Sequence, residues 1–351
     1  MPSYRARSAD LRVMLWIAAR LTLVVAVVQL RVAEAHHSNA QFSLDEVVRF
    51  AATVTAYEWK NPHVFVQVET TDDNGEPVAL QVEGDGTSVL VPLGWSRDSL
   101  EVGDRVWIEA NPARSASRPS VLGRAITKQD GTILFPNPEF IRTASPAATD
   151  AATGLNGVWL PRHEDFFTYM RSAPSWSLTE LGQQYLDAYD GSQNVQAECV
   201  SVSSPAIMVY MVHTELEVLE DRVIMKSDWM NVERVIYTDG RTHPEHGDRT
   251  PQGHTIGHWE GDALVMDTRL FSAHPGGLVI GVPSGLQKHL RERLTLQADG
   301  KALRYEFVLE DPEYLLEPVT GSAIWHYRPE LEPAANECDL EAAQRYLKES
   351  E

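Results

Sequence analysis

The densest group of residues that could do chemistry lies between positions 241 and 274, where histidines and acids alternate with apolar residues. On a strand, residues two apart share a face, so His254, His258 and Glu260 should point the same way. The sequence after Glu260 should turn the chain, and the returning strand would then bring Asp267 close to positions 254–256. An imidazole close to a carboxylate suits proton transfer or a metal site.

These residues suggest two kinds of role. His254 is the candidate acid or base, and Asp267 is the candidate group that orients it. The candidate ligand-binding residues around this pair are Arg241, His243, His258, Trp259 and Glu260. The alternative is that the histidines are solvent-exposed at a barrel rim, and that acids beside a glycine turn serve only the turn.

The start of the chain holds a second candidate, a copper site. If cleavage falls after Ala35, His36 presents a free α-amine beside its own imidazole, and His63 could supply a third nitrogen ligand. Nitrogen ligands of this kind suit Cu(II). The alternative is that His36 is a frayed, solvated terminus and that His63 is a surface histidine in a loop.

Several common catalytic motifs are missing from the sequence. There is no G-x-S-x-G elbow, no G-x-G-x-x-G after a strand, no P-loop and no H-E-x-x-H or C-x-x-C pair. Covalent hydrolysis, dinucleotide redox chemistry and phosphoryl transfer are therefore disfavoured. The two cysteines, Cys199 and Cys338, carry no nucleophile signature; they could form a disulfide or remain as buried thiols.

The charge of the chain argues against two classes of partner. The formal net charge is −20, and the first 35 residues hold five arginines against two acids, so the remaining chain carries −23. Such an acidic body repels phosphate backbones and anionic membrane surfaces. We therefore expect no nucleic-acid partner.

Residues 1–35 have the pattern of a cleavable secretory signal. Three arginines precede an apolar stretch, Val13–Leu30, which is followed by the small-residue site Ala33-Glu34-Ala35. The pattern predicts a mature chain that begins at His36, is periplasmic or secreted, and has no stable membrane insertion after cleavage. The alternative is an uncleaved anchor, because the stretch approaches the length of a membrane span.

Residues 36–135 have the pattern of a small β-barrel. Strands are expected at 47–57, 64–69, 78–82, 105–110 and 124–128, with a short irregular helix within 88–100. Asn74-Gly75 is a strong hairpin signal between the second and third strands. Three strands, a helical connection and two more strands form the order of an OB-type barrel.

A linker at 136–154, rich in proline, alanine and threonine, leads to a second domain at 155–351. A helix is expected at 178–189, and the strands that follow are joined by short turns such as Asp299-Gly300. Such a meander predicts a lipocalin-like antiparallel β-barrel, so the fold class is mainly β, with an OB-like barrel first. The aromatic residues between 166 and 176 should plug one barrel end or cover an apolar pocket.

Four stretches resemble uncharacterised families. Ala35-His36-His37-Ser38 and Trp59-Lys60-Asn61-Pro62-His63 resemble a family of uncharacterised secreted bacterial proteins, with a His-His-Ser start and a Trp-x-Asn-Pro-His motif. The stretches 234–244 and 253–268, which contain Gly253-His254-Thr255-Ile256-Gly257-His258-Trp259-Glu260-Gly261-Asp262, resemble a domain of unknown function. That pattern usually has arginine at the position of His258. Neither resemblance implies an activity.

The leading hypothesis is an exported two-domain protein that binds a small, largely apolar molecule in the C-terminal barrel, near His243, His254 and Asp267. One alternative is a non-redox enzyme, a hydratase, isomerase or cyclase, in which His254 and Asp267 carry out acid–base chemistry. Another is a copper-binding protein with an N-terminal histidine brace at His36.

Overall fold

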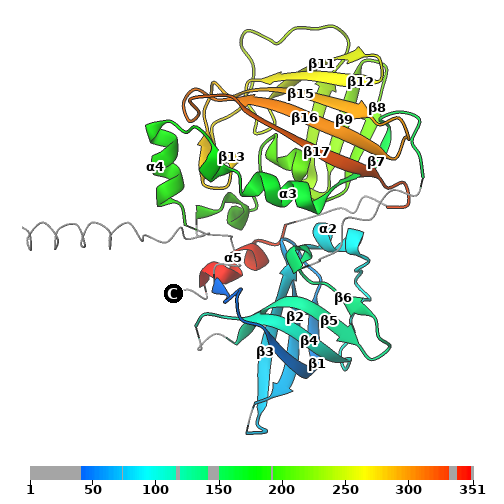
Figure 1. Cartoon of the computed structure of the whole chain (residues 1–351), viewed down its shortest axis with the longest axis vertical. Helices are drawn as coiled ribbons and strands as arrows, with labels where there is room; N and C mark the ends of the chain where they lie inside the picture. Colours follow the sequence, from blue (N-terminus) through cyan, green and yellow to red (C-terminus); the bar gives the residue numbers. More distant parts are fainter. Residues whose placement is uncertain are drawn as a thin grey trace, which may run out of the picture. The chain divides into compact units, whose positions relative to one another are not determined.

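The computed structural model describes residues 41–72, 74–115, 119–140, 150–190, 193–331 and 338–348. The predicted signal at 1–35, its cleavage site and the candidate copper ligand His36 lie outside these residues. The described chain is mainly β and contains two barrels, which confirms the expected fold class (Figure 1). Among the described residues, no helix is both long and apolar enough to cross a membrane.

The N-terminal barrel has the strand order of an OB fold. Its sheet runs β3-β2-β1-β4-β5-β6, and a parallel pairing between β3 and β5 closes it. A short helical connection, α2 with η2, separates β3 from β4, where the sequence predicts an irregular helix. The elements are β1 (Val48–Glu58), β2 (His63–Thr71), β3 (Pro77–Asp85), α2 (Thr87–Leu90), η2 (Val91–Leu93), β4 (Arg105–Pro112), β5 (Ser120–Lys128) and β6 (Ile133–Leu134).

The β2–β3 hairpin forms at the predicted Asn74-Gly75 turn. The Asp72 carboxylate accepts hydrogen bonds from the backbone N–H groups of Asn74 at 2.8 Å and Glu76 at 2.9 Å. Gly75 has a φ of +84°, which a residue with a Cβ adopts reluctantly. The turn fixes a register that continues from Thr71 opposite Pro77 to the far end of the hairpin, where His63 lies opposite Asp85.

The C-terminal barrel closes with nine strands in the order β10-β11-β12-β15-β16-β17-β7-β8-β9. Neighbouring strands are antiparallel except for β10 and β11, which are parallel, because segment 238–253 carries the chain back before β11 begins. The strands are β7 (Gly157–Pro161), β8 (Thr214–Val218), β9 (Arg222–Ser227), β10 (Val232–Tyr237), β11 (His254–Glu260), β12 (Ala263–Arg269), β15 (His289–Leu296), β16 (Ala302–Glu310) and β17 (Val319–Tyr327).

Short helices and one further hairpin accompany this barrel. The helix expected at 178–189 is α4, and the Thr179 side chain caps it by accepting a hydrogen bond from Gly182 N at 3.1 Å. The remaining elements are η3 (Pro138–Phe140), α3 (His163–Met170), η4 (Ala173–Ser175), α4 (Glu180–Ala188), η6 (Val195–Glu198), η7 (Ala206–Val209), η8 (Trp229–Asn231), β13 (His274–Val279), β14 (Val282–Ser284) and α5 (Leu340–Lys348).

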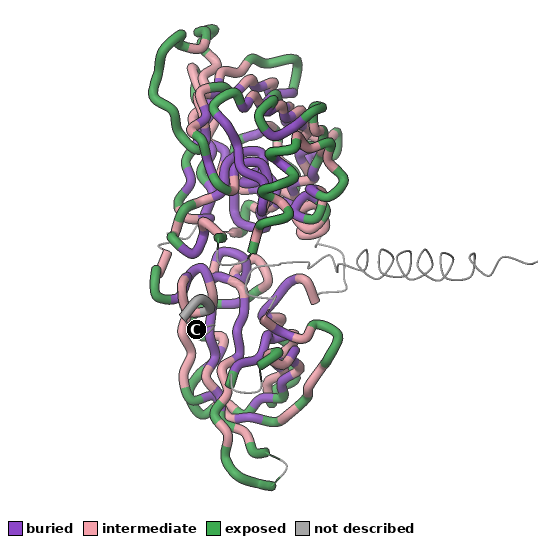
Figure 2. Tube along the Cα trace, turned by 90° about the vertical axis from the view of Figure 1, so that its left-hand side faces the viewer, coloured by how far each residue is buried: buried purple, intermediate pink, exposed green. Residues whose placement is uncertain are grey.

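The chain around η7 fills the lumen of the C-terminal barrel. Residues 206–212 are all buried in its core. Figure 2 shows buried chain, in purple, inside this barrel. Met208 contacts two inward-facing wall residues: its carbonyl accepts from Trp325 Nε1 at 2.9 Å, and its sulfur lies 3.6 Å from Arg234 Nη1. The barrel is therefore a packed core with an internal plug, and it differs in this respect from the open cup of a ligand-carrying barrel.

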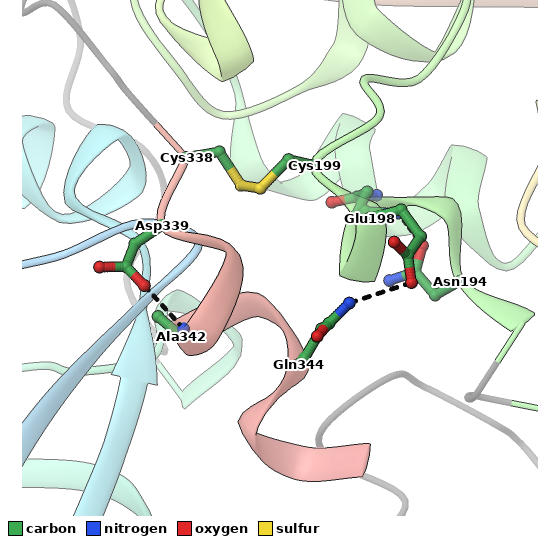
Figure 3. The surroundings of a disulfide bond; sticks show 8 residues. Asn194, Glu198, Cys199, Cys338, Asp339, Ala342 and Gln344 are labelled. Atoms are coloured by element: carbon green, nitrogen blue, oxygen red, sulfur yellow. Dashed lines mark hydrogen bonds between the residues drawn. A yellow bond between two sulfur atoms is a disulfide. The ribbon is translucent and has the colours of Figure 1, made fainter. Parts of the chain in front are cut away.

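A disulfide joins Cys199 to Cys338 and links η6 to the start of α5 (Figure 3). The Asp339 carboxylate accepts a hydrogen bond from Ala342 N at 2.9 Å in the first turn of α5. Gln344 on the same helix donates to Glu198 Oε1 at 3.1 Å. Of the two sequence-based alternatives for the cysteines, the disulfide is confirmed.

Candidate functional site

A chain of imidazoles and carboxylates crosses the outer wall of the C-terminal barrel. On β12, Met266 and Thr268 are buried and point inward, so Asp267 between them points outward. The β11–β12 register places Ile256 opposite Asp267, and His254 lies on the same outer face two residues earlier. The turn at Gly261 therefore brings Asp267 into the neighbourhood of His254.

His243, from segment 238–253, links His254 to Asp267. Its Nε2 lies 2.8 Å from Asp267 Oδ1, and its Nδ1 lies 2.9 Å from His254 Nδ1. Because a carboxylate only accepts, His243 Nε2 carries a proton and donates it. When the His243 ring is neutral, its Nδ1 accepts a hydrogen bond from His254 Nδ1. In that tautomer, His254 Nε2 is the unprotonated nitrogen.

The surroundings shift the pKa values of Asp267 and His254. Burial alone would raise the pKa of Asp267, but hydrogen bonds from His289 and His243 outweigh burial and hold that pKa below its ordinary value. Burial lowers the pKa of His254, and the neighbouring His243 and Arg241 lower it further. Asp267 is therefore an anion and His254 is neutral near pH 7. His254 Nδ1, which faces His243, is the ring nitrogen with a side-chain hydrogen-bond partner among the described residues.

Arg241 reaches this group through an aromatic ring. The ring of Tyr237 stacks on His254 with centroids 5.4 Å apart, and the Arg241 guanidinium lies 3.8 Å from the Tyr237 centroid. Asp239 holds Arg241 in place by accepting from its Nε at 2.9 Å. Arg241 thus packs over the outer face of Tyr237, which fixes the plane of the candidate base.

His289 and Glu310, which the sequence analysis did not single out, extend the chain across two more strands. His289 Nε2 lies 2.7 Å from Asp267 Oδ2, and His289 Nδ1 lies 3.1 Å from Glu310 Oε2. Glu310 also accepts from Arg291 at 3.0 Å. The β15–β16 register places His289 opposite Glu310, and the turn at Asp299-Gly300 was the signal that could have found this pair.

The other predicted ligand-binding residues lie at the far end of β11. His258 Nε2 is 3.2 Å from Glu260 Oε1, with 65% and 52% of the two side chains exposed. Glu260 also accepts from Arg293 at 2.7 Å. Trp259 is exposed on the opposite face of the strand. His258 is four residues from His254, or about 13 Å along a strand, so these residues form a separate solvated cluster.

The candidate copper ligand His63 lies in the N-terminal barrel. Its Nδ1 is 3.4 Å from Gly84 O and 3.5 Å from Glu83 Oε1. In the part of the chain that the structure describes, no group of three or more histidine, cysteine, aspartate or glutamate side chains is arranged to hold a metal ion. Because His36 lies outside that part, the copper brace stays a prediction.

A buried ionic network inside the C-terminal barrel also escaped the sequence analysis. Arg234 forms a two-point ion pair with Glu292, and one of its bonds, Nη1 to Oε1, is 2.9 Å. Thr268 accepts from Arg234 at 2.7 Å, and the Tyr305 hydroxyl donates to Glu292 at 2.8 Å. The polar atoms of this pair are thus engaged within the protein, which fits a structural role in the core.

A cavity of about 130 Å³ lies beside α3, away from the histidine chain. Its walls are mainly apolar, and the aromatic residues predicted to plug a barrel end or cover a pocket contribute to them. The apolar lining includes Phe166, Phe167, Met170, Tyr210, Met211 and Trp229. Phe166 meets Tyr210 edge to face, with ring centroids 5.0 Å apart. A cavity of about 150 Å³ with apolar walls is large enough to take up benzene.

Ionisable side chains from the end of β2–β3 that is far from the hairpin turn also line this cavity. They are His63 and Asp85, and Glu139 of η3 lies with them. Burial raises the pKa of Asp85 to about 7, and the neighbouring His63 only partly opposes this. Burial lowers the pKa of His63. Among the described residues, no group donates a hydrogen bond to the Asp85 carboxyl.

Comparison with known protein families finds a match in the N-terminal part of the chain. Residues 24–122 match a family of unknown function, DUF6152. The matched range covers most of the N-terminal barrel and agrees with the resemblance of this part to an uncharacterised family. No curated protein matches the chain.

Proposed function

We propose that the mature protein is exported and binds a small, largely apolar molecule in the cavity beside α3. The main support for this proposal is the lining of the cavity. Aromatic and thioether side chains surround a space for about one ring, and ionisable groups also contribute to the walls. Small-molecule sites commonly combine apolar walls with a few convergent polar groups. This location differs from the one suggested by sequence, because the plug at 206–212 occupies the barrel lumen.

Two observations support export. The Ala33-Glu34-Ala35 site follows an apolar stretch after an arginine-rich start. The disulfide between Cys199 and Cys338 is a bond that persists mainly in oxidising compartments. The Trp59-Lys60-Asn61-Pro62-His63 motif adds a resemblance to secreted proteins. N-terminal sequencing of the exported chain should therefore start at His36.

Filling the cavity should weaken binding. Ala343 of α5 lines the cavity and is 1% exposed, so Ala343→Leu places three more carbon atoms at its wall. We expect benzyl alcohol, a probe about the size of the cavity, to bind the mature wild-type protein in saturation-transfer NMR and calorimetry. We expect its affinity to fall at least about tenfold in the variant, which corresponds to about 1.4 kcal/mol.

Ala188→Leu is the matched control, because Ala188 is exposed on α4 and does not line the cavity. It should bind benzyl alcohol like the wild type. Melting temperatures of both variants would show that each is folded. Equal binding by wild type and folded Ala343→Leu would place the probe elsewhere and contradict the proposed site.

A second function is favoured by the histidine chain on the barrel wall. With His243 neutral, Asp267, His243 and His254 form a relay that ends in an unprotonated Nε2, the arrangement of a general base held in one tautomer. When His254 Nε2 takes a proton, its Nδ1 proton can pass to His243 Nδ1, and the positive charge moves toward the Asp267 carboxylate. Such a group would serve proton abstraction in an isomerisation, hydration or elimination.

Ring opening of 5-nitrobenzisoxazole, which needs only proton abstraction, tests this base. We expect His254→Gln to lower the protein-catalysed rate at least about tenfold, since a positioned base contributes about 10²–10⁴. Asp267→Asn should lower the rate and change its pH profile. His258→Gln makes the same change on the same strand outside the relay and should leave the rate intact. An unchanged rate in His254→Gln would remove this second function.

A further inference from the structure

The charged side chains that line the cavity beside α3 are acidic. Its acids are Asp85 and Glu139, and a third acid, Glu83, lies 3.5 Å from the lining residue His63. Among the described lining residues there is no lysine and no arginine. Glu139 is already paired with Arg171 outside the lining. Asp85 is therefore the lining carboxyl without a partner of opposite charge in direct contact.

The apolar walls have a matching electrostatic character. Four aromatic side chains contribute, from Phe166, Phe167, Tyr210 and Trp229. The faces of aromatic rings carry partial negative charge and attract ammonium groups within about 6 Å. Methionine sulfur atoms are polarisable and adapt to the shape of a ligand. A cation with an apolar body would find favourable contacts on both the acidic and the aromatic sides.

We infer that the ligand of this cavity is a small primary amine with an apolar body, bound as the ammonium ion beside Asp85. The inference rests on the proposed function, because it names the ligand class of the same cavity. An ammonium group gives Asp85 the partner that the protein does not supply. It also offers three N–H donors, which suit a carboxylate and a neighbouring amide oxygen such as that of Gln196.

A neutral apolar ligand would bind in the cavity less tightly than an amine. It would leave the Asp85 carboxyl, whose charged form is disfavoured by burial, without compensation. An anionic ligand would meet two acids of its own sign. The volume of about 130 Å³ limits the body of the amine to about one ring or a short branched chain.

The test compares benzylamine with benzyl alcohol, which share a ring and a one-carbon arm and differ in charge. Calorimetry at pH 8 on the mature, disulfide-bonded protein should show benzylamine binding at least about tenfold tighter. Asp85→Asn should remove that advantage and leave benzyl alcohol within about twofold. Asp98→Asn removes one negative charge from an exposed position of the same barrel and should change neither affinity. Asp85→Ser is a second variant for the case in which Asp85→Asn does not fold.

The outcomes separate the two proposals. If benzyl alcohol binds in the cavity and benzylamine binds no tighter, the amine class is wrong while the cavity remains a binding site. If benzylamine binds tighter and Asp85→Asn and Asp98→Asn weaken it equally, the advantage is a general effect of acidity, and the role of Asp85 is overturned. If neither compound binds, the cavity is not a ligand site, and both proposals fail together.

Discussion

Asp85 and Asp267 show how the surroundings decide the chemistry of one side chain. Asp267 lies partly exposed on the barrel wall, where two imidazoles donate to it and its pKa is lowered. Asp85 lines an apolar cavity, receives no hydrogen bond from the described residues, and its pKa is raised to about 7. Hydrogen bonds to the charged form and loss of hydration act in opposite directions. The first acid is thus suited to orient a base, and the second to receive a cation.

The raised pKa of Asp85 predicts how stability depends on pH. The folded protein keeps the Asp85 proton up to about pH 7, whereas the unfolded chain releases it near pH 3.8. The contribution of Asp85 to stability is therefore fully present below the unfolded value and is lost as the pH rises toward 7. Asp85→Asn, which never ionises, should be more stable than wild type at pH 8 by about 1–4 kcal/mol and similar to it at pH 4.

Urea denaturation followed by tryptophan fluorescence at both pH values would measure this difference. Asp98→Asn, at an exposed position, should show no comparable change between pH 4 and pH 8. A variant that is equally or less stable than wild type at pH 8 would mean that Asp85 ionises freely in the folded protein. That result would also remove the uncompensated acid from the cavity.

The hairpin turns explain which residue pairs of the candidate sites could be predicted from the sequence. In an antiparallel pair, the turn fixes every later pairing, so the sequence placed Asp267 near His254 across the Gly261 turn. The same reasoning, continued to the strand ends, would have paired His63 with Asp85 and His289 with Glu310. These pairs were accessible from the sequence because each depends on one local turn.

Other parts of the structure depend on contacts that no local pattern records. The parallel pairing of β10 with β11 is reached through segment 238–253, and this segment delivers His243 between His254 and Asp267. The apolar run at 206–212 reads as a strand by composition, but it lies inside the barrel as a plug. A run of buried apolar residues does not show whether the segment is a strand of the barrel wall or a plug inside the barrel. The sequence anticipated the aromatic side of the cavity but missed its ionisable lining, because that lining comes from distant segments.

The C-terminal helix α5 contacts residues from the first barrel and is tied to η6 of the second part of the chain. Asp339 N donates to Asn61 O at 2.8 Å, and Arg345 pairs with Glu58 at 3.0 Å. On the other side, Cys338 is bonded to Cys199 (Figure 3). Ala343 of α5 and Ala197 of η6 both line the cavity. The disulfide therefore holds together two elements of the proposed binding site.

Removing the disulfide should destabilise the protein substantially. The bond joins residues 139 positions apart, and closing so long a loop in the unfolded chain restricts it strongly. We expect Cys199→Ser with Cys338→Ser to lower the free energy of unfolding by about 3–5 kcal/mol, measured by urea denaturation. Wild type treated with dithiothreitol should match the double variant. A loss below about 1 kcal/mol would show that the two ends are held together without the bond.

The position of β7 also has a consequence for the order in which the chain can fold. β7 begins at Gly157, yet one of its neighbours in the barrel is β17, which pairs Tyr327 with Trp159. Its other neighbour, β8, follows only after the plug. During synthesis, one edge of β7 therefore stays unpaired until about 170 further residues have emerged. Pairing between strands so far apart in the sequence is slow. The second barrel cannot close before β17 has been synthesised, whereas the strands of the first barrel are complete by residue 134. The two barrels should thus fold one after the other, and the N-terminal barrel should be folded before the C-terminal barrel begins to close.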